Sequence, residues 1–542
     1  MITGSYNRAV SLIVGVWAAV GLLLRLYQLS KPGFLLGVTQ YDDGVLFGNA
    51  VRLAQGVIPY RDFIMVQPPG SMLLMAPVAL FTKVTGTAWG LALARILTVC
   101  ADTACIVLLG LLTRHRGRLA VAIACGVYAV YPGALVASST FLLEPWLNVC
   151  CLAAALLIFD GDRFAGDRRL ALGGAVFGFA VSIKLWAAVP LLILGLLLAA
   201  KPRRLGLLAG GALAGLAVPV LPFLLLAPGQ LVSQVITSQF LRSTLPHPLL
   251  PRLADMAGLS LWPGLPQAAG TVVVLAVTVY LMAGYLSARR PPAMLDRYVL
   301  ASLAATVVMF LLPWEYYSHY AAFAVPFGAL TLALPAGLRR HAKPRLAEPR
   351  QAQPRHQPGP GAIGLMALPA CAVAVTALIA ATGLRQVTAG SQVQEPPGLV
   401  AAVERLIPAG ACVITNDPAL TIVANRFIAA HPGCPAVVDT YGTLLAMTGG
   451  RPQSAPLPAL RLAERTWQRW FHQATYVWLG TADHGLPWVN SLYNYLGAYF
   501  HRVPLAEAGP IQRGGLFFRA STVTSHRRSR RAGGARRSPR YR

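Results

Sequence analysis

Residues 10–26 read Val-Ser-Leu-Ile-Val-Gly-Val-Trp-Ala-Ala-Val-Gly-Leu-Leu-Leu-Arg-Leu, and a polar loop that carries Tyr41-Asp42-Asp43-Gly44 follows them. An apolar run of this kind predicts a membrane-spanning helix. No small-residue cleavage site follows it, so we expect a retained first helix and not a signal peptide. The chain has only 19 Asp and Glu in 542 residues. Two adjacent carboxylates just outside a membrane span therefore indicate a place where chemistry is done.

The composition excludes an ordinary soluble globular protein, because 56% of the residues are hydrophobic and only 12% are charged. The mean hydropathy is +0.57. Apolar runs long enough to cross a bilayer predict about 11 spans. We expect an all-α polytopic membrane protein with a small C-terminal α/β domain. The predicted spans are residues 10–28, 89–113, 118–137, 145–160, 169–183, 185–200, 205–227, 267–287, 296–313, 321–338 and 361–383.

The positive charges predict the orientation of these spans. The net charge of +27 comes largely from basic residues in short loops and one tail, which indicates topology and anionic lipid rather than nucleic acid. Five basic loops fall on one side if the N-terminus is cytoplasmic. They contain Arg114/Arg116/Arg118, Arg163/Arg168/Arg169, Lys201/Arg203/Arg204, Arg289/Arg290/Arg297 and the run from Arg339 to Arg355. The outer side then receives residues 29–88, 138–144, a turn at Lys184, 228–266, 314–320 and everything after 384. One long helix over 169–200 is the alternative, and it inverts everything downstream.

The chain divides into a membrane module and an outer domain. Residues 1–340 form the module, with the long first outer loop at 29–88. Residues 341–360 are a Pro- and Arg-rich cytoplasmic linker, and residues 361–383 are the last span. Residues 384–525 are the outer α/β domain, with strands expected at 412–414, 436–438 and 476–479 and helices at 399–406 and 457–472. Residues 526–542 are expected to form a disordered Arg-rich tail that contacts anionic lipid headgroups or an anionic cell-wall polymer.

The cysteines divide into two groups. Six lie in apolar spans and are expected to be small core residues. Cys412 and Cys434 lie in the outer domain, where a disulfide and two reduced core thiols are both open.

The first outer loop is too long for a simple connector. Residues 45–54 have apolar side chains at helical spacing and predict an amphipathic helix lying in the membrane interface. Asp42 and Asp43 stand at its N-terminus, where the helix dipole favours carboxylates. A plain N-cap role for Asp42 is the alternative, although it leaves Asp43 and the Arg61-Asp62 pair unexplained.

Further polar residues recur at the same membrane level. They are Glu144 before Pro145, Lys184 in an apolar stretch, and Glu315 and His319 around Tyr316 and Tyr317. An ionisable residue in an apolar run is a functional candidate because it is costly to keep there. Lys184 snorkelling or paired with Glu144, and His319 within an aromatic belt, are the structural alternatives.

Two charged residues inside the second span have a structural interpretation. Arg95 and Asp102 are expected to pair with each other there.

Such a set suits transfer at a lipid phosphate. A carboxylate can act as general base on an acceptor hydroxyl, and a Lys or Arg can neutralise a leaving phosphate. Aromatic rings offer stacking faces for sugars.

The order of these features over residues 10–340 resembles the GT-C integral-membrane glycosyltransferases. These include protein O-mannosyltransferases, lipid A aminoarabinose transferases and actinobacterial arabinosyl- and mannosyltransferases. The matching features are Asp42-Asp43 heading a juxtamembrane helix, Gln67-Pro68-Pro69 leading to a helix that ends at Gly86, Glu144-Pro145, Lys184, and Tyr320 with Pro326.

The resemblance implies a polyprenyl-phosphate sugar donor, an extracytoplasmic site and inversion at the anomeric carbon. The expected acceptor is a cell-envelope glycan, lipid or protein. Asp42 is then the expected base, with Asp43 second. Some members have Lys where this chain has Gln67, so phosphate contact falls to Arg61 or Lys184. The expected donor and substrate residues are Arg61, Gln67, Glu144, Lys184, Tyr317 and His319.

Two other functions remain open. A transporter or flippase of lipid-linked sugars would use a similar cavity, but no internal repeat is visible. A non-catalytic envelope-binding protein would leave Asp42 and Asp43 unexplained. No cofactor is certain. A divalent metal held by the carboxylates with His319 is open, although no ligand spacing demands one.

Overall fold

The structure, a computed structural model, describes residues 2–242, 248–259, 269–288, 291–312, 316–338, 360–388, 394–395, 397–480, 486, 490–503 and 515–519. The helices of the first half are α1 (Ile2–Leu29), α2 (Tyr41–Ala54), α3 (Gly70–Thr85), α4 (Thr87–Thr113), α5 (Arg118–Val130), α6 (Pro132–Ser138), α7 (Glu144–Ile158), α8 (Asp167–Ile183), α9 (Ala188–Leu197) and α10 (Pro202–Leu226). Short elements follow: α11 (Pro228–Val232), a π-helical turn η3 (Ser233–Thr237), α12 (Ser238–Phe240) and α13 (Leu249–Met256). The last membrane-module helices are α14 (Ala269–Ala288), α15 (Met294–Leu311), α16 (Ala321–Leu338) and α17 (Pro360–Thr388).

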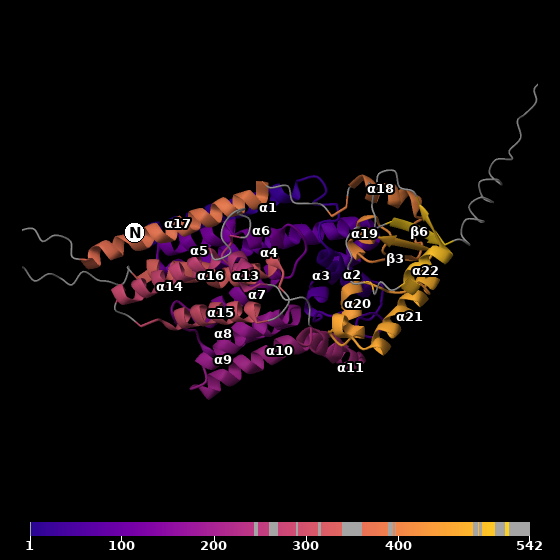
Figure 1. Ribbon diagram of the computed structural model, residues 1–542. Helices are drawn as coiled ribbons and strands as arrows, with labels where there is room; N and C mark the ends of the chain where they lie inside the picture. The colour runs from indigo at the N-terminus through magenta and orange to yellow at the C-terminus, as the bar shows by residue number, and fades with distance from the viewer. Residues whose placement is uncertain are drawn as a thin grey trace, which may run out of the picture.

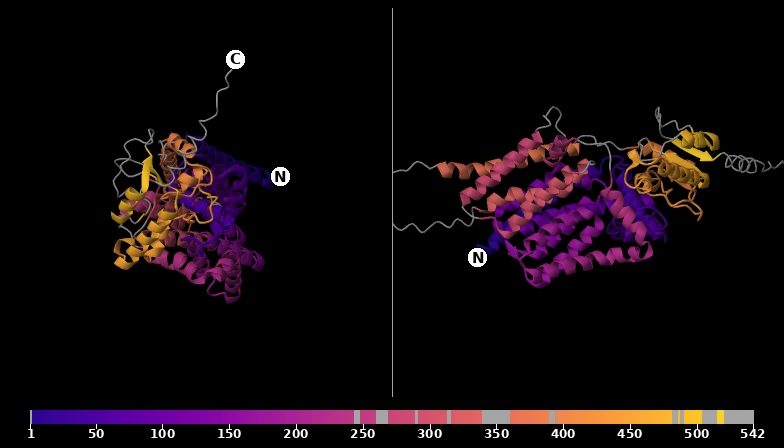
Figure 2. Two further views of the ribbon diagram at one scale, coloured as in Figure 1. Left: turned by 90° about the vertical axis from the view of Figure 1, so that its right-hand side faces the viewer. Right: turned by 60° about the horizontal axis from the view of Figure 1, so that its bottom comes forward.

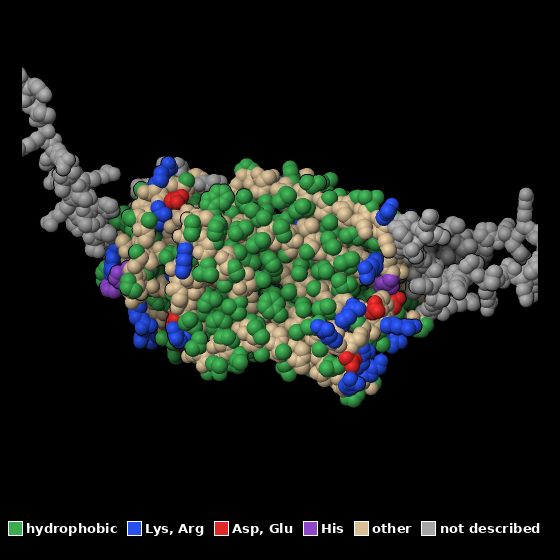
Figure 3. Space-filling view, turned by 180° about the vertical axis from the view of Figure 1, so that it is seen from behind, with side chains coloured by type: hydrophobic (Ala, Val, Ile, Leu, Met, Phe, Trp, Pro, Cys, Tyr) green, Lys and Arg blue, Asp and Glu red, His purple; other side chains and the backbone are tan. Residues whose placement is uncertain are grey.

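The long helices run side by side, with the C-terminal domain at one end of the bundle and the N-terminus at the other (Figures 1 and 2). A broad hydrophobic band covers the middle of the surface, and charged side chains gather toward both ends (Figure 3). Within the described residues, 6 helices are long and apolar enough to cross a membrane, or 7 if a bent pair counts as one span. The polytopic membrane fold is therefore confirmed, whereas the count of eleven spans stays a prediction.

The bent pair is α5 with α6, which meet at an angle of 54°. Residues 118–137, expected as one span, turn at Tyr131 because Pro132 follows it. A residue before proline avoids the α region, and Tyr131 indeed has an extended ψ of 127°.

The segment 169–200 is a helix pair and not one long helix. Helix α8 ends at Ile183, Lys184 is extended (φ −154°, ψ 133°), and a short turn η2 (Leu185–Ala187) leads into α9. The pair on which the predicted topology depends is thus confirmed.

Four of the predicted basic loops share one end of the bundle. Buried Arg116 forms ion pairs with Asp162 and Asp296, so three loops meet at one guanidinium. Arg204, in the remaining loop at 201–204, forms an ion pair with Asp167 at 3.3 Å. The loop at 163–169 begins with the hairpin of β1 (Phe159–Asp160) and β2 (Arg163–Phe164). Which side of the membrane this end faces stays a prediction. The run at 339–355, Glu315 and the tail 526–542 lie outside the described residues.

The C-terminal domain is α/β, as expected. Its sheet has the order β3-β4-β6-β5, in which β3 (Val413–Thr415) is parallel to β4 (Tyr476–Leu479). The strands β6 (Gly515–Arg519) and β5 (Phe500–Val503) continue it antiparallel. Its helices are α18 (Pro397–Leu406), α19 (Pro418–Val423), α20 (Thr440–Met447), α21 (Leu457–Gln473) and α22 (Asn490–Tyr499). The predicted helices at 399–406 and 457–472 are confirmed as α18 and α21.

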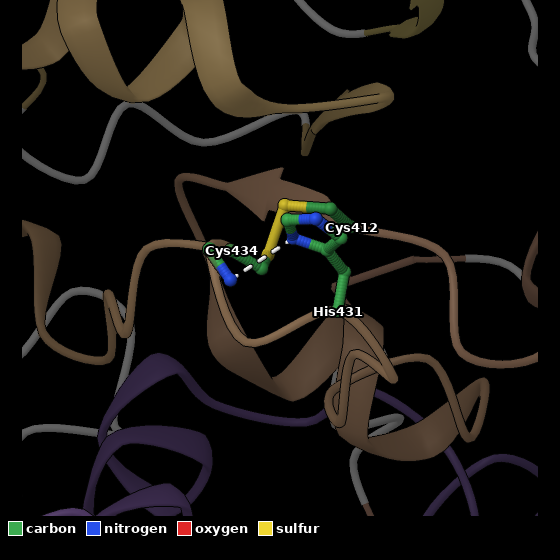
Figure 4. The surroundings of a disulfide bond; sticks show 4 residues. Cys412, His431 and Cys434 are labelled. Carbon is green, nitrogen blue, oxygen red and sulfur yellow. Dashed lines mark hydrogen bonds between the residues drawn. A yellow bond between two sulfur atoms is a disulfide. The ribbon is translucent and has the colours of Figure 1, made fainter.

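The expected strand at 436–438 is wrong. Val438, 2% exposed, lies against Gly48 of α2, and Val437 packs on the apolar core of the C-terminal domain, so these side chains are used for packing instead of strand pairing. Cys412 and Cys434 form a disulfide that joins the residue before β3 to this segment (Figure 4).

Helix α2 contains the predicted 45–54 helix, and its position in the membrane interface stays a prediction. Every residue from Asp43 to Arg52 is buried. Helices α3 and α4, together with α19 of the C-terminal domain, pack against it. The apolar stripe that predicted lipid contact is thus a protein-packing face.

Candidate active site

Tyr41-Asp42-Asp43-Gly44 forms the first turn of α2, and its four residues have four different neighbours. The Tyr41 hydroxyl donates to Asp439 Oδ1 at 2.8 Å and accepts from the backbone N–H of Tyr441 at 3.0 Å. Asp439 is the N-cap of α20, where it also accepts from Gly442 N at 2.6 Å. The motif thereby holds the C-terminal domain at its first residue.

Asp43 is fully buried and paired with Arg95 of α4. Arg95 Nε donates to Asp43 Oδ2 at 3.0 Å, and its Nη1 donates to the carbonyls of Phe34, Leu35 and Gly37 at 2.7–3.0 Å. The expected pairing of Arg95 with Asp102 is therefore wrong.

Asp102 instead pairs with Arg25 of α1 at 2.6 Å. Arg95 lies nearer the end of α4 where the first outer loop packs, so that loop's carboxylate reaches it. Asp102, two turns deeper, meets a neighbouring span.

Gly44 permits close approach of the C-terminal domain. A Cβ at this position would lie 2.4 Å from Ala419 N in α19. Any larger residue would therefore force α2 and α19 apart.

Asp42 points to a different neighbourhood. The N-cap of α2 is Gln40, so Asp42 is not the cap. Its side chain is 46% exposed, and Oδ2 lies 3.9 Å from His319 Nε2. Desolvation by the surrounding protein raises the pKa of the Asp42 carboxyl, while the charges of His319 and Lys184 oppose that rise. Although the Asp42 side chain is partly exposed, the surrounding protein excludes enough water for desolvation to outweigh the effect of these two charges.

Glu144 and Lys184 complete this neighbourhood. Lys184 Nζ donates to Glu144 Oε1 at 2.7 Å, and both are largely buried. His319 Nε2 lies 4.0 Å from the same Glu144 oxygen, so the imidazole stands between two carboxylates. The break between α8 and α9 is what brings Lys184 here. Gly70, after Gln67-Pro68-Pro69, packs on Ser182 just before that break, where a Cβ would lie 2.3 Å from Ser182 Oγ.

Aromatic rings border the cations. Lys184 Nζ lies 3.4 Å from the centre of the Trp186 ring and 4.8 Å from that of Tyr320. Tyr317 stacks on His319 with ring centres 5.8 Å apart and remains 42% exposed. A partly exposed tyrosine ring beside His319 can stack on a sugar ring.

Two residues of this neighbourhood escaped the sequence argument. Arg242 follows α12, packs its guanidinium 4.9 Å from the Tyr441 ring, and acts electrostatically on Lys184 and Asp439. Asp439 is buried, and desolvation raises the pKa of its carboxyl. The rarity of acids in the chain was the available signal for Asp439. No pattern in the sequence pointed to Arg242.

Two predicted site residues lie elsewhere. Arg61 is exposed and forms a two-bond pair with Asp62, at 2.8 and 3.0 Å. The Gln67 backbone carbonyl accepts from the Tyr60 hydroxyl at 2.8 Å. Within the described part of the chain, neither residue forms an ion pair with Asp42, Glu144, Lys184 or His319.

The six segments predicted to share the outer side all contribute to one cluster. They supply Asp42, Glu144, Lys184, Arg242, His319 and Asp439, which we call the outer cluster. The partly exposed carboxylate of Asp42 thus lies beside His319 and Lys184 at the end of the bundle that carries the C-terminal domain.

Within the described residues, no group of three or more His, Cys, Asp or Glu side chains is placed to hold an ion. Glu144 Oε1 is engaged by Lys184, and a divalent metal held by the carboxylates with His319 stays a prediction.

No family model and no curated protein matches the chain by sequence. Solved structures do match its fold. ArnT from Cupriavidus metallidurans bound to undecaprenyl phosphate aligns with 93% of this chain and 97% of its own, at a TM-score of 0.56 and 16% identity. The Archaeoglobus fulgidus oligosaccharyltransferase in complex with Zn and sulfate aligns with 86% of this chain and 68% of its own, at a TM-score of 0.51 and 14% identity.

Both are GT-C superfamily proteins. The chain therefore has the GT-C fold of integral-membrane glycosyltransferases, as the order of its sequence features implies.

Proposed function

We propose that the protein is an inverting glycosyltransferase that moves a sugar from a polyprenyl-phosphate donor to a cell-envelope glycan, lipid or protein on the extracytoplasmic face. The observation that carries this proposal is the outer cluster, in which Asp42, unlike the buried Asp43, is partly exposed and lies close to His319 and Lys184. The fold is shared with a protein whose structure contains undecaprenyl phosphate, which supports the class of donor.

The chemistry follows from the positions of these groups. An acceptor hydroxyl loses its proton to Asp42 as its oxygen attacks the anomeric carbon. The bond from that carbon to the phosphate oxygen breaks, and polyprenyl phosphate leaves with the bonding electrons. Lys184 and Arg242 neutralise the leaving phosphate. A raised pKa strengthens Asp42 as a base.

Asp43 supports this reaction from behind. Its pairing with buried Arg95 fixes the loop at 34–39 and the start of α2. We propose that it positions Asp42 and does not itself take the proton.

The proposed orientation places the outer cluster outside the cytoplasm and the N-terminus inside, with eleven spans in all. The disulfide between Cys412 and Cys434 supports it, because disulfides persist in oxidising compartments.

An in vitro assay with radiolabelled polyprenyl-phosphate sugars tests the proposal. Purified protein in lipid nanodiscs should release polyprenyl phosphate and transfer label to an envelope acceptor fraction. Translocation of the intact lipid across vesicles without any transfer would instead support a flippase.

A further inference from the structure

A separate cavity lies between the first outer loop and the C-terminal domain. It has a volume of about 260 Å³, and its lining includes no member of the outer cluster. Loop residues 60–64 form one wall, and residues 435–438 with Thr443, Trp470 and Gln473 form the other. The volume is just below the range of about 300–1,000 Å³ usual for small-molecule sites. The cavity therefore suits a small polar unit.

The polar lining selects an uncharged ligand. Arg61 and Asp62 face each other through two hydrogen bonds, and Asp62 Oδ2 also accepts from Ile58 N at 2.8 Å. Because the guanidinium is neutralised by its neighbour, the pair offers donors and acceptors side by side without net charge. Vicinal hydroxyls match such a planar pair, whereas a phosphate would compete with Asp62.

An aromatic wall completes the match to a sugar. Trp470 on α21 lines the cavity and is held edge-on by buried Trp467, with ring centres 4.9 Å apart. A tryptophan fixed in this way offers an apolar face to the C–H side of a sugar ring. Gln473, one turn later on the same helix, adds an amide at the rim.

A second cavity makes the site an extended one. Its volume is about 390 Å³, and it shares Ile64 with the first. Helix α20 lines both, through Thr443 in the first and through Ala446 and Met447, one turn on, in the second. The remaining wall comes from α11 and the π-helical turn η3. A ligand of several linked units fits this pair better than a single sugar.

Helix α20 also connects the cavities to the outer cluster. Its N-cap Asp439 is bonded to Tyr41, the residue before Asp42. Thr443 follows four residues later, about 6 Å along the helix axis. A chain bound in the cavities can thus present its end near Asp42.

We propose that these two cavities bind the neutral saccharide chain of the acceptor. The inference rests on the proposed function and specifies its acceptor as a glycan. It assigns Arg61 to the acceptor and not to donor phosphate, together with Asp62, Thr443, Trp470 and Gln473.

Direct binding tests the proposal on the full chain in nanodiscs. Linear oligosaccharides of arabinose, mannose, galactose and glucose are the probes, and saturation-transfer NMR is the readout. At least one should bind the wild type. Trp470→Ala should weaken that binding about tenfold, because it removes the apolar face on which the sugar ring is expected to lie.

A second variant guards against a simple folding defect. Gln473→Trp fills the cavity from an exposed position and should also abolish binding, while Arg465→Ala, exposed on the same helix outside the cavity, should not. The proposal is overturned if Trp470→Ala and Gln473→Trp bind the oligosaccharides as tightly as the wild type does, or if no oligosaccharide binds at all. So does binding of a peptide library that depends on Trp470 and Gln473 when no sugar binds.

The two proposals fail separately. Trp470-dependent sugar binding without any transfer of label would contradict the proposed function but support saccharide binding in the cavities. Transfer to a glycan whose acceptor KM is the same in Trp470→Ala and wild type would contradict acceptor binding in the cavities but support the transferase function.

Discussion

At the scale of residues, the two adjacent aspartates have different tasks because they are adjacent. Successive side chains on an α-helix point about 100° apart, since the helix has 3.6 residues per turn. Asp43 consequently turns inward to Arg95, and Asp42 turns toward His319. Tyr41 and Gly44 face the C-terminal domain. The motif couples a reactive carboxylate to the elements that hold it.

The raised pKa of Asp42 predicts the pH dependence of transfer. A general base works only when deprotonated, so the rate should fall as pH falls through the pKa of Asp42. Because that pKa is raised, the loss should begin above the usual aspartate value of about 4. The measurement is kcat/KM against pH in nanodiscs. An acid limb that persists unchanged in Asp42→Glu would assign the titration to another group.

Lys184 and Glu144 allow a test of chemistry against stability. If Lys184 binds the leaving phosphate, Lys184→Ala should cut turnover strongly with a small change in Tm, and Lys184→Arg should restore part of it. If the pair is only structural, each single variant should destabilise the fold by about 3–5 kcal/mol and the double variant should recover. Turnover and Tm of wild type, both singles and the double separate these cases. Activity that tracks Tm alone would make Lys184 structural.

At the scale of elements, α2 is the helix on which the two parts of the molecule meet. Its apolar residues pack on α3, α4 and α19, and its first turn carries the hydrogen bond to α20. Docking of the C-terminal domain and placement of Asp42 should therefore depend on one another.

Gly44→Ala tests this dependence. The added Cβ meets the backbone N of Ala419, which cannot move away as a flexible side chain could. We expect faster hydrogen exchange in α19 and α20 and a lower transfer rate. Gly15→Ala is the matched control, because nothing lies within 4 Å of a Cβ there. Equal exchange in the two variants would show that the contact does not hold the domain.

The sequence could predict elements wherever periodicity or apolar length decided the outcome. The helix pair around Lys184 and the helix at 45–54 followed from such patterns. The partners of the charged residues did not. Arg95 has Asp102 two turns along its own helix, but Asp43 from a distant loop reaches it instead. The prediction of a strand at 436–438 was wrong for the same reason, since an apolar segment can pack against any neighbouring element and need not pair with a strand.

At the scale of the whole molecule, the topology brings six sequence-distant segments together at one end of the bundle. Basic loops are joined at the other end by Arg116. The orientation predicts that exposed Gln55 and Ser454 face outward and exposed Arg203 faces the cytoplasm. Single cysteines at these positions, in a background without other free cysteines, should be tested with a membrane-impermeant maleimide on intact cells. Labelling of the position at 203 alone would reverse the topology.

The central claim is that the outer cluster is an active site in which Asp42 takes the acceptor proton. The most direct measurement is turnover of purified Asp42→Asn with a radiolabelled polyprenyl-phosphate sugar, beside wild type and with Tm measured on the same samples. The side chain keeps its size and loses only the base, so turnover should fall about 10²–10⁴-fold or more while Tm stays close to that of wild type. Near-normal turnover in a folded Asp42→Asn protein would contradict the claim.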